Sequence, residues 1–288
     1  LVIESTMLPL KYYDLDAAII FSDILMIPWA MERNVRFCKN VGPLLDPMIP
    51  DQTKILKNVS IKKKLEPLSR SISILRGKLQ KDKSLIGFAG APWTLACYMI
   101  EGRGSKDFIN TRKALWGSNK WFMELLDTLS YYVTQKLEMQ ARAGADILMI
   151  FDTWSHMIPN NFFKACAINP ISYIIQSLRK KNITTPIIGF PFKAGASVAQ
   201  YSYESNVDCI ALDWSIDLDW ANHNINKEIA IQGNLDPASL IPINNKHLKK
   251  NVLSILRVLK DRRLIFNVGH GLTPDCKIDN VKTVIDIV

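Results

Sequence analysis

The sequence predicts an α/β fold built on a parallel sheet, and two observations lead to this prediction. Short apolar runs recur along the chain with amphipathic, helix-like stretches such as 120–143 and 249–260 between them, which is the alternation of a parallel α/β sheet. The runs are continuously apolar rather than alternating, as expected of strands that are covered on both faces. They are residues 17–22, 85–90, 147–152, 186–190, 209–213, 229–233 and 264–269.

The number of runs indicates a barrel that lacks one strand. A (β/α)8 TIM barrel has eight strands in about 250 residues, and this 288-residue chain offers seven. No linker rich in Gly, Pro or Ser divides the chain, so we expect one domain over 1–288. The chain starts abruptly with Leu1 in a helix-like stretch, and we therefore expect the domain to be incomplete at the N-terminus, with the first strand upstream. Residues 31–83 form a long insertion with a helix over 65–81.

Composition narrows the possible environments and partners. Five cysteines are scattered without a CxxC pair and no secretory leader is visible, which favours free thiols in the cytoplasm and disfavours zinc. No apolar run is long enough to span a membrane. The formal charge of +9 suits polyanionic partners, but the Lys clusters are typical of solvated faces. We expect no nucleic-acid binding, because no basic motif with interleaved aromatic residues appears.

The predicted strands share a feature at their carboxyl ends, which are polar or unusual in sequence. In parallel sheets and barrels, ligands bind at this end. Seven such ends in succession predict one polar active-site mouth. The endings are Ser22-Asp23, 90–93, Asp152-Thr153, Lys193, Asp213-Trp214, 232–234 and 267–271.

Asp23 is the candidate catalytic residue. It is a lone carboxylate between two apolar runs, and burying it is costly unless a cation or several N–H groups meet it. One interpretation is a helix cap or a satisfied core carboxylate. The other is a carboxylate that faces the mouth, where it could accept N–H bonds from a ligand and stabilise a cation forming beside it.

Three further residues are candidates for ligand contacts. Tyr98 lies one turn into a helix that follows a strand, where a core role is the alternative. Thr153 could donate to a ligand carboxylate or cap the next helix, and the sequence does not decide. His270 lies between two glycines, which allow close backbone approach to a ligand, so we favour a contact role. The other histidines receive no role, and no catalytic triad or metal motif is present.

These stretches together resemble the uroporphyrinogen decarboxylase family of haem biosynthesis. The similarity runs from 14 to 288 in the family's order, and the pairing of GFAGAPWT with EGxGSKDF is specific. The matching motifs are AAIIFSDIL, GFAGAPWTLACYMIEGRGSKDF, GADILMIFDTW, CIALDW, IQGNLDP and FNVGHG.

The resemblance implies a single (β/α)8 barrel, usually a homodimer with facing clefts. It implies removal of the four acetate carboxyl groups of uroporphyrinogen III, giving coproporphyrinogen III, without cofactor or metal. In the family the Asp of FSDIL binds the pyrrole N–H groups and stabilises positive charge, and Asp23 matches it. Tyr98, Thr153 and His270 match residues that contact the substrate.

Departures from the family pattern keep two alternatives open. The family's first strand and its arginine-bearing RQAGR loop have no counterpart here, so we expect the chain as given to be unstable or inactive without an upstream segment. It could accordingly be an inactive remnant. The second alternative is a corrinoid or coenzyme M methyltransferase, whose zinc-binding His-x-Cys pair is absent around His270.

Overall fold

The computed structural model describes residues 1–288 except 40, 53–55, 57–58, 118 and 244–245. Its centre is a curled parallel sheet of seven strands in the order β1-β4-β5-β6-β7-β8-β9, as predicted. Each predicted apolar run overlaps one strand, with ends shifted by up to three residues. The strands are β1 Ala17–Ile19, β4 Ser84–Gly90, β5 Ile147–Asp152, β6 Ile187–Pro191, β7 Cys209–Ala211, β8 Ala230–Leu235 and β9 Leu264–Val268.

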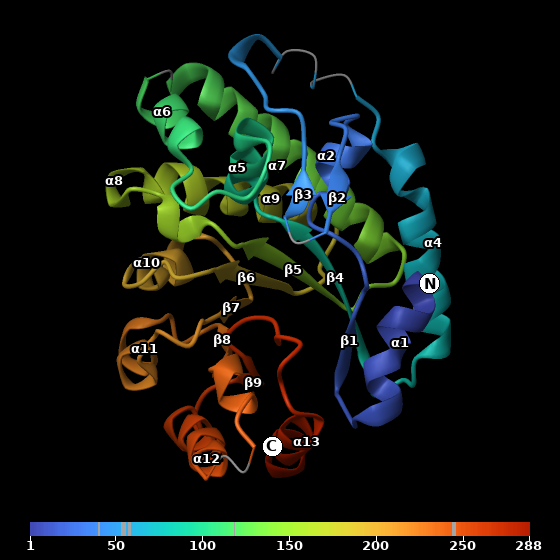
Figure 1. Cartoon of the computed structure of the whole chain (residues 1–288), viewed down its shortest axis with the longest axis vertical. Coiled ribbons are helices and arrows are strands. Elements are labelled where there is room, and N and C mark those ends of the chain that lie inside the picture. Colours follow the sequence, from blue (N-terminus) through green and yellow to red (C-terminus); the bar gives the residue numbers. More distant parts are fainter. Residues whose placement is uncertain (40, 53–55, 57–58, 118, 244–245) are drawn as a thin grey trace.

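Helices lie around the outside of the curled sheet (Figure 1). The longest, α7, matches the predicted amphipathic stretch and packs on β4 and β5. The α-helices are α1 Val2–Tyr12, α2 Met26–Ala30, α4 Lys62–Lys78, α5 Pro92–Glu101, α6 Ile109–Gly117, α7 Asn119–Arg142, α8 Asn160–Phe163, α9 Asn169–Lys180, α10 Ser197–Glu204, α11 Leu218–Asn224, α12 Leu248–Val258 and α13 Ile278–Ile287. Shorter helical turns are η1 Pro50–Gln52, η2 Ser155–Met157, η3 Lys164–Ile168 and η4 Pro237–Leu240.

The sheet is open along one side. Neighbouring strands of this sheet pair in parallel, but β1 and β9 do not pair with each other, so among the described residues each has one edge without a partner strand. We call these two edges the open seam. Exposed apolar side chains lie on its strands and next to them, with exposed fractions of 43% for Ile19, 55% for Phe21 and 38% for Ile265. The seven-stranded part of the fold prediction is thus confirmed.

The insertion between β1 and β4 contains an antiparallel pair that the sequence did not predict. It is formed by β2 (Arg36–Cys38) and β3 (Gly42–Leu44). Its helix, α4, begins and ends three residues before the predicted 65–81. The insertion docks on the end of α5, where Leu45 N donates to Gly102 O at 2.7 Å. Gly102 has φ +76°, and a Cβ there would lie 2.8 Å from Leu45 O, so glycine is required.

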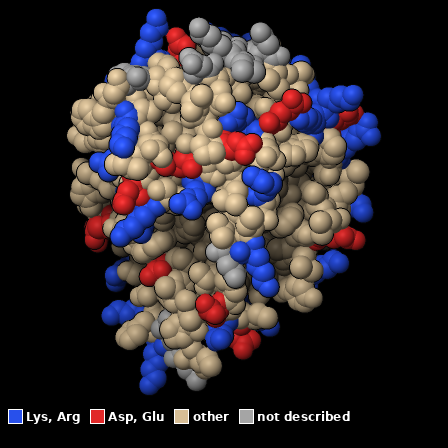
Figure 2. All heavy atoms as spheres, turned by 45° about the horizontal axis from the view of Figure 1, so that its top comes forward, with Lys and Arg blue, Asp and Glu red and all other residues tan. Residues whose placement is uncertain are grey.

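The surface and the thiols agree with the composition. Lys and Arg side chains are interspersed with Asp and Glu over the face drawn in Figure 2, as expected of solvated surfaces. All five cysteines are free. In the part of the chain that the structure describes, no helix is both long and apolar enough to cross a membrane.

Candidate active site at the carboxyl ends of the strands

Asp23 follows β1, and the turn that carries it is closed by its own carboxylate. Oδ1 accepts a hydrogen bond from Leu25 N at 2.6 Å, and the Asp23 carbonyl accepts one from Met26 N at 3.3 Å. This local turn leads into α2, whose own N-cap is Leu25. The side chain is half-buried, and within the described residues Oδ2 has no hydrogen-bond donor. One carboxylate oxygen therefore remains available to a ligand.

Tyr98 lies close to Asp23. Pro92 at the first position of α5 starts the helix directly after β4, and this places Tyr98 in its second turn. Burial raises the pKa of the Tyr98 hydroxyl, and the nearby Asp23 carboxylate raises it further. The hydroxyl is therefore a hydrogen-bond donor at neutral pH, within electrostatic range of that carboxylate.

Thr153 and Asp152 follow one another at the end of β5 but are held differently. Asp152 is buried and accepts a hydrogen bond from Thr94 Oγ1 at 2.6 Å, while its Oδ2 has no partner among the described residues. Burial raises the pKa of Asp152 to about 7. Thr153 is half-buried, and the N-cap of the next helical turn is Trp154. The capping interpretation of Thr153 is therefore wrong.

His270 is exposed beyond the end of β9 and stands among aromatic rings. Its ring centroid lies 4.6 Å from that of Phe192 and 6.3 Å from that of Trp214. Partial burial lowers the pKa of His270, and the Lys193 ammonium lowers it further. The imidazole is therefore neutral at pH 7 and can both donate and accept a hydrogen bond.

A series of ring contacts joins Tyr98 to His270 across the mouth. The centroid distances are 6.0 Å for Tyr98–Trp154, 5.9 Å for Trp154–His156, 6.3 Å for His156–Phe192 and 4.6 Å for Phe192–His270. Thr153 precedes Trp154 in the chain, and the Asp23 carboxylate raises the pKa of Tyr98. The structure thus brings the four predicted residues to one end of the sheet.

The mouth also contains a lysine to which sequence analysis gave no role. Lys193 follows β6 with φ +55°, and its N–H donates to Asp213 Oδ2 at 2.9 Å. Its Nζ lies 5.0 Å from the Trp214 ring centroid and 5.4 Å from that of Phe192. In the described residues it has no carboxylate partner within ion-pair distance. Its position at a strand end was the available signal, but that signal did not distinguish it from other surface lysines.

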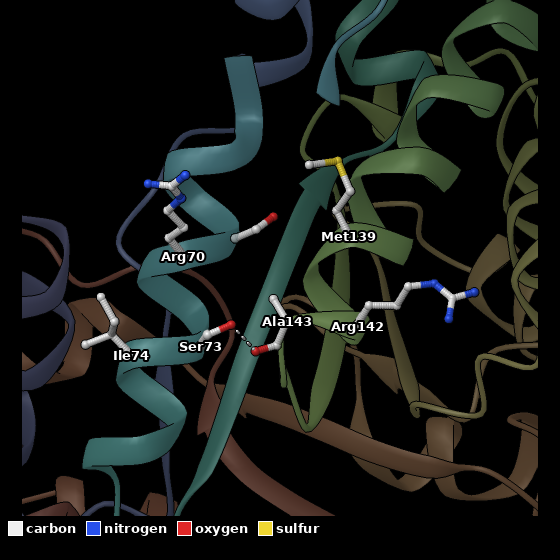
Figure 3. Close-up of a pocket in the computed structure, with 7 residues that line it drawn as sticks. Arg70, Ser73, Ile74, Met139, Arg142 and Ala143 are labelled. Carbon is white, nitrogen blue, oxygen red and sulfur yellow. Dashed lines mark hydrogen bonds between the residues drawn. The ribbon is translucent and has the colours of Figure 1, made fainter. Parts of the chain in front are cut away.

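A groove on the outer helices lies away from this mouth. A shallow groove between α4 and α7 is crossed by the hydrogen bond from Ser73 Oγ to Ala143 O at 2.9 Å (Figure 3). It belongs to the outer helix layer and contains none of the candidate residues.

Throughout the described ranges, no group of three or more His, Cys, Asp and Glu side chains is placed to hold a metal ion.

Comparison with known proteins identifies the family. The model of the uroporphyrinogen decarboxylase family matches residues 1–288. A uroporphyrinogen decarboxylase from Brucella anthropi is 40% identical over 286 residues, which are 99% of this chain and 83% of that protein. The chain belongs to the uroporphyrinogen decarboxylase family. A second relative, from Brucella canis, is 38% identical over the whole chain and 84% of its own length.

Solved structures share the fold of this chain. A methyltransferase from Methanosarcina mazei superposes with a TM-score of 0.83 at 16% identity, over 99% of this chain and 83% of that one. A putative vitamin-B12-independent methionine synthase from Listeria monocytogenes gives 0.61 at 12% identity, over 99% and 84%. At these identities the likeness shows the fold alone, and it supports the predicted barrel architecture.

Proposed function

We propose that this protein decarboxylates the four acetate side chains of uroporphyrinogen III, which yields coproporphyrinogen III. The observation that carries the proposal is the family match over 1–288, with relatives of that name at 38–40% identity. The mouth supports it, because Asp23, Thr153 and His270 follow strands at this end of the sheet and Tyr98 lies in the helix after β4. The methyltransferase alternative has only the shared fold in its favour.

The proposed chemistry uses the substrate's own pyrrole as the electron acceptor. A proton adds to a ring carbon, the pyrrole becomes cationic, and the electron pair of the breaking carbon–carboxylate bond then neutralises that cation as carbon dioxide leaves. Loss of carbon dioxide leaves an exocyclic methylene group, and a second proton adds to this carbon to form the methyl group. The ring carbon then releases the first proton, which restores the pyrrole, so one proton is taken up per carboxyl group lost. Asp23 accepts the pyrrole N–H bonds and stabilises the cation, because an anion fixed beside developing positive charge lowers the barrier.

Substrate binding is assigned to the rest of the mouth. Tyr98 and Thr153 donate hydroxyl hydrogen bonds to substrate carboxylates, and His270 contacts the substrate from the opposite side. Lys193 supplies a positive charge for one carboxylate of this octacarboxylate ligand, and the aromatic rings beneath it keep its ammonium in the mouth. The protein is proposed to act as a cytoplasmic homodimer without a cofactor.

Product analysis with variants of Asp23 tests the proposal. Wild-type protein should convert uroporphyrinogen III into coproporphyrinogen III, and Asp23→Asn should lower kcat by roughly 10²–10³-fold, the usual loss for one preorganised electrostatic group. The amide keeps the shape of the side chain but lacks its charge. Chromatography of the oxidised porphyrin products measures both rates.

Asp82→Asn is the matched control, because Asp82 is exposed before β4, at the opposite end of the sheet. It should turn over uroporphyrinogen at the wild-type rate. If Asp23→Asn retained full turnover, Asp23 would have no part in the reaction. A folded wild-type protein without turnover would favour the inactive remnant instead.

A further inference from the structure

A lysine is buried directly behind Asp23. Lys136 belongs to α7 and only 1% of its surface is exposed. Its neighbours on the inner face of the helix, Val133 and Leu137, are apolar, as is usual for a helix that packs on a sheet. A fully buried lysine is rare because its charge is removed from water.

The ammonium group reaches the turn that carries Asp23. Nζ donates a hydrogen bond to the Asp23 carbonyl at 3.3 Å and lies 5.4 Å from the ring centroid of Phe88 in β4. In the described ranges no carboxylate oxygen lies within 4.0 Å of Nζ, so the contact is not an ion pair. The lysine therefore holds the main chain of Asp23 and leaves its carboxylate uncovered.

Electrostatics couple the two side chains. Burial lowers the pKa of Lys136 to about 7, and the Asp23 carboxylate partly offsets this decrease. Asp23 is the charged group that acts on Lys136 among the described residues; β4 contributes the uncharged Phe88, and Tyr98 of α5 responds to the same carboxylate. An apolar residue at position 136 would avoid this desolvation cost, so a charged residue at this buried position indicates a specific role.

We propose that Lys136 is a positioning residue that fixes the turn bearing Asp23 and keeps its carboxylate ionised when a polyanionic substrate binds. This inference rests on the proposed function, because the role of the lysine depends on the negative charge of the proposed substrate. A substrate with eight carboxylates brings like charge toward Asp23 and favours its protonation, which would remove the anion that the pyrrole cation requires. The buried ammonium opposes that effect, and the substrate's negative charge in turn keeps Lys136 protonated.

Two substitutions separate the charge from the hydrogen bond. Lys136→Gln keeps a donor but loses the charge, whereas Lys136→Met loses both. The acid limb of the pH profile is the fall of kcat at low pH. In both variants this acid limb should move to higher pH by on the order of one unit, because a charge several ångströms away acts at an effective dielectric constant of about 20. Lys136→Met should also lower kcat at all pH values, because the turn is no longer held.

Gln140→Met is the matched control on the same helix. Gln140 is equally buried and donates to Phe88 O at 2.8 Å, but it does not touch Asp23. Its acid limb should coincide with that of the wild type. If the acid limb of Lys136→Gln also coincided with the wild type, the proposal would be overturned.

A second measurement does not depend on turnover. In protein labelled with 13C at aspartate carboxyl groups, the resonance lost in Asp23→Asn identifies Asp23. Lys136→Gln should move the protonation midpoint of this resonance to higher pH, and an unchanged midpoint would refute the electrostatic role. Absence of uroporphyrinogen turnover in the wild type, with a shifted midpoint in Lys136→Gln, would refute the proposed function but retain the role of the lysine.

Discussion

At the scale of the residue, two carboxylates at the carboxyl ends of β1 and β5 show how little the residue type alone decides. Asp23 is half-buried and leaves Oδ2 without a donor among the described residues, so it can serve a ligand. Asp152 is buried against α5 and accepts the Thr94 hydroxyl, so it organises the protein. Both follow apolar strands in the sequence. Only the surroundings distinguish a binding group from a structural one.

The burial of Asp152 predicts a pH-dependent stability. Its folded pKa of about 7 lies above the ordinary value of 3.8, so the folded state keeps a proton that the unfolded state releases between about pH 4 and 7. The free energy of unfolding should therefore fall as pH rises through this window. Relative to wild type, Asp152→Asn should gain stability by about 1.4 kcal/mol per pH unit there.

Urea unfolding of both proteins at pH 5, 6, 7 and 8 measures this difference. The two proteins should differ little near pH 4 and most above pH 7. Thr94→Val removes the hydrogen-bond donor that lowers the pKa of Asp152, so it should extend the loss of stability to higher pH. Parallel stability curves for wild type and Asp152→Asn would contradict the prediction.

At the scale of the element, the backbone at the end of β6 places an exposed lysine, Lys193, in the mouth. The strand is fully buried from Ile187 to Pro191, and Phe192 continues it toward the rings of Trp214 and His270. Lys193 has a left-handed conformation, its N–H donates to Asp213, and its ammonium lies over the rings of Phe192 and Trp214. Neither residue spacing nor apolar periodicity contains this information, because the partners come from β7 and β9.

The geometry at β6 predicts a role for Lys193 in substrate affinity. Lys193→Met should raise KM for uroporphyrinogen about tenfold with a smaller change in kcat, because a contact made equally in ground and transition states affects binding alone. Lys193→Arg, which keeps the charge, should stay near the wild type. Steady-state kinetics at low ionic strength give both constants.

Lys227→Met provides a control, since Lys227 is an exposed lysine whose Nζ bonds to Asn222, away from the rings of the mouth. An equal rise of KM in both lysine variants would indicate a general effect of net charge. A loss confined to kcat in Lys193→Met would remove the residue from binding.

At the scale of the whole molecule, the sheet is a barrel that is not closed. Its two edge strands, β1 and β9, run parallel in one sheet, and apolar side chains on and beside them are exposed. Unpaired edges of this kind associate with other strands unless they are covered. A closed barrel of this type has eight strands, one more than this sheet.

The open seam predicts how this protein associates in solution. Phe21→Lys combined with Ile265→Lys should reduce assembly beyond a dimer, because charges on edge strands disfavour edge-to-edge pairing. Sedimentation velocity over a range of concentrations measures the assembly. Ile278→Lys changes an exposed apolar residue in α13, off the sheet, and should leave the assembly unchanged. If all variants associated equally, the seam would not drive association.

The sequence by itself determined the parallel α/β class, the seven strands and the carboxyl-end location of Asp23, Tyr98, Thr153 and His270. It could do so because continuous apolar runs and polar strand ends are local patterns. The tertiary structure alone decided that Lys136 lies behind Asp23, that Lys193 lies over the aromatic rings, and that Asp152 faces the helix layer. These relations depend on contacts between segments that are 20 to 113 residues apart, and no local pattern specifies which side chains meet across such distances.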